Sequence, residues 1–229
     1  MEFAGWTVTV THKPIRKMYL RVHGATGAVS VSAPVALADW DIRQFIENHR
    51  DWIDQRRAQA EAERFRIPGF TDGAALTVLG QHWTIRVQSG ASRRSAVSGN
   101  ATVTFHIKTD DGPDQVQRLA DRWIDEQILQ AVEVLIGRYA GMMGVTPGPL
   151  AVRSMRSRWG SCNVRTGRIC VNRALAWADP LLLEYIVVHE LAHLIEPGHS
   201  ARFYAVVDRH FPLRKRCEQE LRRLSRTLV

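Results

Sequence analysis

Apolar and polar residues alternate through the first part of the chain, which is the pattern of strands with one buried face. The alternation covers residues 6–10, 18–22 and 29–32, and glycines mark a turn before the third segment. These segments predict a small antiparallel meander. After Pro34, apolar residues follow a three-four spacing from Asp39, which predicts a helix that continues into a charged, solvated stretch.

A second group of strands follows this helix. Alternation over residues 75–79 and 82–87 predicts two strands joined by a tight turn, and a further strand is expected at 102–108. The intervening segment 89–101 is rich in glycine, serine and arginine, which predicts a mobile loop. Residues 110–113 read Asp-Asp-Gly-Pro, and we place a domain boundary at this break.

The pattern beyond this break is mainly helical. One apolar stripe predicts a long helix over residues 114–142, and residues 149–155 and 168–172 read as two strands of a hairpin. The sequence thus predicts an α+β fold with two domains. A β-rich N-terminal domain with one helix covers 1–112, and a second domain, with the long helix and a small sheet, covers 113–229.

The segment that follows the small sheet predicts another helix. Asp179 is a good N-cap, Pro180 fits the first helical position, and Pro197-Gly198 must end the helix. Apolar residues occupy nearly every position from 181 to 188, which indicates that the helix is buried on most sides. We expect the long preceding helix to pack against it.

His189, Glu190 and His193 form the pattern HExxH on this helix. Residues four apart lie on one helix face, so both imidazoles can reach one ion, and His199 follows six residues later in the loop. Three neutral nitrogens suit a catalytic zinc site with one position open to water, for which Glu190 would act as general base. The alternative is a core helix that contains these residues by chance, and it would leave buried polar groups without partners.

The composition is that of an ordinary globular protein, with 45% hydrophobic and 24% charged residues in 229. Because no apolar run reaches the length of about 18 residues that a membrane span needs, we expect no membrane association. The N-terminus lacks the features of a secretory signal. Three cysteines without a paired metal spacing favour a reducing compartment, so we expect a cytoplasmic protein.

The net charge of +8 favours anionic partners. Nucleic acid, phosphorylated small molecules and acidic proteins all remain open, since basicity does not choose among them. Much of the positive charge lies in the tail from Arg209 to Arg226, where the ordinary interpretation is a solvated helix face.

A second candidate for substrate contact lies between the two strands of the small sheet. Arg156, Arg158 and Trp159 stand close together there, and guanidinium groups suit carboxylate and phosphate. The alternative is an edge strand whose charges discourage aggregation. Composition alone favours that alternative.

Taken together, these segments resemble the YgjP-like metallopeptidase family, whose members are described as metal-dependent hydrolases. The resemblance is distinctive over residues 153–212 and weaker over the N-terminal strands. It rests on Arg156 to Cys162, Gly167, Ile169, Asn172, Leu175, Pro180, residues 185–194, His199, Ser200 and Phe203.

The resemblance implies a zincin-like C-terminal domain in which His189, His193 and His199 hold zinc and Glu190 is catalytic. It also implies that the arginine-tryptophan-glycine segment lies beside the metal cleft and contacts substrate. Metzincins share the histidine spacing but have a glycine where this chain has Glu196, so we do not assign the chain to them. A more distant similarity to SprT-like proteases, which act on DNA-bound proteins, makes nucleic acid a partner to test.

Three functions follow from this sequence. The first is a zinc peptidase, which should pair an extended peptide with an edge strand such as 149–155. The second is a hydrolase of nucleoside triphosphates or other phosphate esters, with Arg156 and Arg158 on the phosphates and Trp159 stacked on a base. The third is a non-catalytic nucleic-acid module with structural zinc, against which an intact Glu190 argues.

Overall fold

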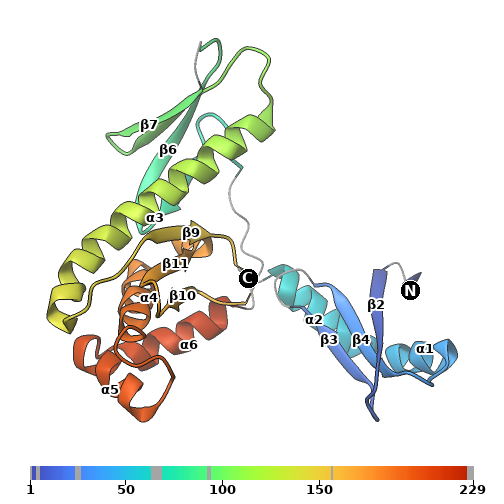
Figure 1. The fold of residues 1–229 in the computed structure, drawn as a ribbon. Helices are drawn as coiled ribbons and strands as arrows, with labels where there is room; N and C mark the ends of the chain where they lie inside the picture. The colour runs from blue at the N-terminus through green and yellow to red at the C-terminus, as the bar shows by residue number, and fades with distance from the viewer. Residues whose placement is uncertain are drawn as a thin grey trace. The chain divides into compact units, whose positions relative to one another are not determined.

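The computed structural model describes residues 2–3, 6–23, 27–62, 69–91, 94–155 and 157–225 (Figure 1). The fold class is α+β, as the sequence predicts. The chain forms two compact units, Met1–Arg66 with Arg222–Val229, and Ile67–Leu221. Within the described residues, no helix combines the length and apolar character that crossing a bilayer requires.

The first unit contains a four-stranded sheet in the order β1-β2-β4-β3. Its strands are β1 (Glu2–Phe3), β2 (Trp6–Lys13), β3 (Tyr19–Val22) and β4 (Val29–Pro34). The expected antiparallel meander is wrong in one respect, because β2 pairs with β4 in parallel and only β3 with β4 and β1 with β2 are antiparallel. Alternation identifies the buried face of each strand but does not decide which strands are neighbours.

The helix predicted after Pro34 is two helices, α1 (Asp39–Glu47) and α2 (Arg50–Ala62). The His49 imidazole Nδ1 lies 2.7 Å from the Phe45 carbonyl oxygen at the junction, which holds the turn between them. Buried residues from the sheet and both helices form one apolar core. These are Val8, Val29, Val31, Ala33, Ile42, Ile46 and Ile53.

The second unit begins with a sheet in the order β5-β6-β8-β7, in which β6 and β8 are parallel. Its strands are β5 (Ala75–Val78), β6 (Gln81–Gln88), β7 (Ser95–Gly99) and β8 (Thr102–His106). Part of the segment expected to be a mobile loop is therefore strand β7, which pairs antiparallel with β8. The β5–β6 turn places Leu79 and Gly80 at φ 48° and 74°, the left-handed geometry of a tight hairpin.

Helix α3 (Pro113–Met143) belongs to the same unit as this sheet. Its Trp123 is buried and packs edge-on against Trp83 and Phe105, with ring centroids 5.1 and 6.4 Å apart. The division into compact units therefore falls near residue 66, and the boundary expected at 112–113 lies inside the second unit. Apolar contacts bridge the Asp-Asp-Gly-Pro break, which the local sequence does not reveal.

The rest of the second unit is a three-stranded sheet covered by helices (Figure 1). It comprises β9 (Leu150–Arg153), β10 (Gly160–Asn163), β11 (Arg168–Asn172), the 3-10 helix η1 (Arg173–Trp177), α4 (Pro180–Ala192), α5 (Ala201–His210) and α6 (Arg214–Leu224). The predicted hairpin of β9 with β11 is wrong, since these strands run parallel and β10 is the hairpin partner of β11. As expected, α3 packs against α4.

Candidate metal centre

Helix α4 begins as the sequence predicts and ends earlier. The Asp179 carboxylate accepts a hydrogen bond from the Leu181 N–H at 2.9 Å, and Pro180 is the first helical residue. The helix ends at Ala192, so His193 is its C-cap, and Pro197-Gly198 follows a further turn.

The three histidines of the predicted site lie together. The imidazole Nε2 atoms of His189 and His199 are 3.1 Å apart, and one nitrogen from each of the three rings lies within 4.8 Å of the others. His199 reaches the cluster because Ser200 caps α5, its hydroxyl accepting from the Phe203 N–H at 3.3 Å.

Phe203 holds the three rings from one side. It is fully buried and stacks on His193 with ring centroids 4.6 Å apart, while its centroid lies 4.9 Å from that of His189 and 4.8 Å from that of His199. An apolar support of this kind limits the orientations of the imidazoles and excludes water from one side of the cluster.

The donor set fits a zinc ion. Two nitrogens bound at about 2.0–2.1 Å to a tetrahedral zinc lie roughly 3.3 Å apart, close to the spacing of His189 and His199. Among the described residues, His193 Nδ1 and Glu190 Oε2 are buried without a hydrogen-bond partner. The former lies near the backbone of Glu196 and Pro197 but makes no well-formed hydrogen bond. Buried polar atoms normally have partners, and a cation in this cluster would stabilise the Glu190 carboxylate.

His189 and His193 are kept neutral by their surroundings. Burial, with smaller contributions from the neighbouring His193, His199 and Arg214, lowers the pKa of His189 to about 3. Burial is also the largest cause of the lowered pKa of His193. Neutral imidazoles have a free nitrogen lone pair, which is the form that binds metal.

Glu190 lies against strand β10. Its side chain is buried, with 4% of the residue exposed, and a Cβ added to Gly160 would lie 2.4 Å from its Oε1 and 2.8 Å from Ile186 Cγ2. Only a glycine allows this approach. Burial raises the pKa of Glu190 to about 8, and the positive charge of Arg158 opposes that rise.

The arginine-tryptophan segment is tied to the sheet by a buried asparagine. The Asn172 amide donates to the carbonyl oxygens of Met155 and Arg158, each at 2.8 Å, and its backbone N–H donates to Trp159 at 2.8 Å. Arg158 is exposed and Trp159 is half-buried. Arg156 lies outside the described residues.

Sequence reasoning did not single out Gly160 or Asn172 except as parts of a resemblance. A polar residue at the end of the apolar run Ile-Cys-Val-Asn, and a glycine in a strand, are the signals that could have found them. It also did not identify Tyr185, whose hydroxyl oxygen lies 3.3 Å from His189 Nδ1.

A family model described as YgjP-like, metallopeptidase domain, matches residues 16–224. No protein among the curated sequences matches the chain. The crystal structure of the metallopeptidase zymogen of Pyrococcus abyssi abylysin is 28% identical, over 43% of this chain and 99% of that chain, with a TM-score of 0.38.

The crystal structure of the zymogen of Methanocaldococcus jannaschii jannalysin is 19% identical, over 42% of this chain and 94% of that one, with a TM-score of 0.36. The family model extends over most of the chain, from within the first unit to α6. The chain belongs to the YgjP-like metallopeptidase family.

Proposed function

We propose that this chain is a zinc-dependent peptidase in which His189, His193 and His199 hold the ion and Glu190 is the general base. One observation carries the proposal. Three imidazole nitrogens lie within 4.8 Å of one another, beside a buried carboxylate whose Oε2 has no partner among the described residues. A purely structural metal site has no use for such a carboxylate.

The chain's own groups would do the following in peptide hydrolysis. Zinc held by three imidazoles supplies Lewis acidity, which polarises a carbonyl and acidifies water. Glu190 takes a proton from the attacking water as the new C–O bond forms, and gives that proton to the amine as the C–N bond breaks. The missing side chain of Gly160 leaves room for the Glu190 carboxylate.

The strand that would pair with an extended peptide is β10. The sequence suggested residues 149–155, which contain β9, but β9 and β10 are the two edges of the described sheet, with β11 between them. Strand β10 lies against α4, where its Gly160 approaches Glu190 and Ile186. An edge strand beside the reacting groups can align a peptide by main-chain hydrogen bonds.

A phosphate-ester hydrolase is the second candidate. The observation that favours it is the position of Arg158. This residue is exposed, yet it lies close enough to Glu190 for its positive charge to oppose the rise that burial causes in the pKa of that carboxyl. A guanidinium there would bind a phosphate oxygen near the site. Arg156, which the sequence pairs with it, and Trp159 as a base-stacking residue stay predictions, as do nucleic-acid binding and a cytoplasmic location.

The test is a parallel screen of the zinc-loaded protein against a peptide library and nucleoside triphosphates, with Glu190→Gln as the blank. We expect peptide cleavage that the variant loses while its zinc content is unchanged. Triphosphate turnover without peptide cleavage would replace the peptidase by the second candidate. A Glu190→Gln variant as active as the parent would refute the proposed base.

A further inference from the structure

A series of hydrogen bonds connects His189 to helix α6. The Tyr185 hydroxyl lies 3.3 Å from His189 Nδ1 and 3.3 Å from Glu218 Oε1. Arg214 Nη1 donates to the same Glu218 oxygen at 2.9 Å. Three of these residues, Tyr185, Glu218 and Arg214, are neither proposed metal ligands nor the proposed base.

The far end of this series is fixed. The Arg214 guanidinium donates to both Asp208 carboxylate oxygens, at 2.6 and 3.0 Å, and lies over the ring of Tyr204, 4.6 Å from its centroid. Its side chain is largely buried. An arginine anchored in this way forms an ion pair with Glu218 and holds its carboxylate in place.

The hydrogen-bond directions then follow from the chemistry of the groups. An ionised carboxylate only accepts, so the single hydroxyl proton of Tyr185 is donated to Glu218. The hydroxyl oxygen is left as an acceptor, so the His189 Nδ1 must carry the proton that it accepts. In a neutral ring, Nε2 is then the atom with the free lone pair. That atom is the one found 3.1 Å from His199 Nε2.

We propose that Tyr185 and Glu218 are positioning residues that fix His189 as its Nδ1–H tautomer and so direct Nε2 to the metal. This inference rests on the proposed metal site. Both Tyr185 distances are at the long end of the hydrogen-bond range, so the pair orients the ring more than it stabilises the fold. Partners of metal-bound histidines commonly change metal affinity when they are removed.

The chain offers a matched control for the hydroxyl. Like Tyr185, Tyr139 donates its hydroxyl proton to a glutamate, in this case Glu184 of α4, at 2.5 Å. Among the described residues, Tyr139 has no contact with the three histidines. Tyr185→Phe keeps the ring packed between His189 and Phe211, with centroids 5.8 and 5.7 Å away. The two Tyr→Phe variants therefore lose the same kind of bond in two places.

Two measurements on the full chain test the proposal. The first is the zinc dissociation constant, from competition with a chromophoric chelator. The second is the tautomer of His189 in the metal-free protein, from nitrogen-15 NMR of the imidazoles. Tyr185→Phe should raise the dissociation constant by about 10- to 100-fold and populate the Nε2–H tautomer, while Tyr139→Phe should change neither.

Glu218 provides a second pair of variants, so that the test does not depend on one of them folding. Glu218→Gln retains an acceptor oxygen and should keep most of the zinc affinity, whereas Glu218→Leu should lose it as Tyr185→Phe does. Wild-type affinity and an unchanged tautomer in Tyr185→Phe or Glu218→Leu would refute the positioning role of these two residues. That result would not contradict the proposed metal site. A parent protein that takes up no zinc would instead refute the proposed function. The tautomer measurement would still show whether Tyr185 and Glu218 fix the tautomer of His189.

Discussion

Helix α4 has two glutamates six residues apart, and their surroundings differ. Glu184 is half-buried, and its Oε1 accepts hydrogen bonds from Tyr139 at 2.5 Å and from Arg138 at 2.9 Å. Glu190 is buried, and among the described residues its Oε2 has no partner. Burial of an acid is therefore not the mark of a working site. What distinguishes Glu190 is a carboxylate oxygen without a partner next to three converging imidazoles.

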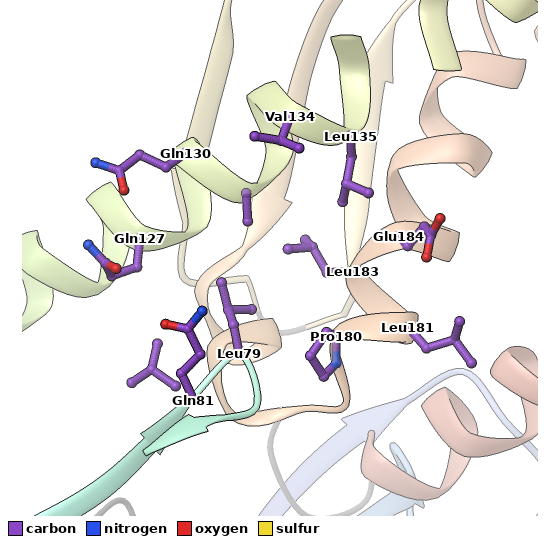
Figure 2. A pocket seen from close by; sticks show the side chains of 12 residues that line it. Leu79, Gln81, Gln127, Gln130, Val134, Leu135, Pro180, Leu181, Leu183 and Glu184 are labelled. Atoms are coloured by element: carbon purple, nitrogen blue, oxygen red, sulfur yellow. The ribbon is translucent and has the colours of Figure 1, made fainter. Parts of the chain in front are cut away.

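The same contrast separates the two ends of the helix. The pocket beside Glu184, about 480 Å³ in volume, is mainly apolar and lies between α3, α4 and the β5–β6 turn (Figure 2). Its polar groups are glutamine amides and the partnered Glu184. The histidine end of α4 instead gathers neutral nitrogens and an unpartnered carboxylate. We therefore assign the chemistry to that end alone.

Exchanging each glutamate for glutamine should give opposite results. Glu190→Gln should lower peptide turnover by about 10²- to 10⁴-fold, since it removes the general base, and should leave the stability of the fold unchanged. Glu184→Gln should keep turnover and lower the free energy of unfolding by about 1 kcal/mol, because charged hydrogen bonds to Tyr139 and the exposed Arg138 are weakened. Steady-state kinetics and urea unfolding measure both. Equal effects of the two substitutions on turnover and on stability would contradict the proposed difference between Glu184 and Glu190.

Removing one histidine sharpens the comparison at the metal. His199→Ala should weaken zinc binding by about 100-fold or more, because one of three converging nitrogens is lost. His210→Ala, at the end of α5 and half-buried, is the control and should bind zinc like the parent. Zinc titration against a chelator distinguishes them. An unaltered affinity in His199→Ala would remove this residue from the site.

Adding one methyl group to strand β10 tests how closely Glu190 is held. Gly160→Ala places a Cβ 2.4 Å from Glu190 Oε1, so the carboxylate must move. A displacement of this kind should lower turnover by about 10²-fold with zinc content retained. Gly137→Ala on α3 meets no atom within 4 Å and should raise stability by about 0.5–1 kcal/mol without loss of activity. Normal turnover in Gly160→Ala would contradict the close packing.

The smallest effect is expected at a partnered carboxylate remote from α4. The hydrogen bond from Arg94 lowers the pKa of Asp111 to about 2. Since this is below the ordinary value of 3.8, the pair contributes stability above about pH 4, and the contribution is lost as the pH falls through 2. Asp111→Asn should flatten that part of the melting-temperature profile and leave turnover alone. A profile identical to the parent's would show that the pair is inactive in solution.

The grouping of the three histidines was more predictable than the topology, and the reason is physical. His189, Glu190, His193 and their helix follow from local rules of spacing and capping, and His199 follows from the forced helix end. The parallel pairings of β2 with β4 and β9 with β11 depend on residues far apart in the sequence, as do the contacts of Trp123 that join α3 to the β5–β8 sheet. Alternation does not encode them.

The partners of the site were also beyond local reasoning. Gly160 meets Glu190 across 30 positions of sequence, and Glu218 meets Tyr185 across 33. No rule of sequence spacing predicts either contact. The sequence did predict that Glu190 would need a partner, because a buried carboxylate is unfavourable without a cation nearby.

X-ray absorption at the zinc edge of the zinc-loaded protein tests the central claim most directly. The account predicts one zinc per chain with three imidazole nitrogens at about 2.0–2.1 Å and one further light atom, and two imidazoles in His199→Ala. A spectrum with sulfur in the coordination sphere, or with fewer than three imidazoles in the parent protein, would contradict it.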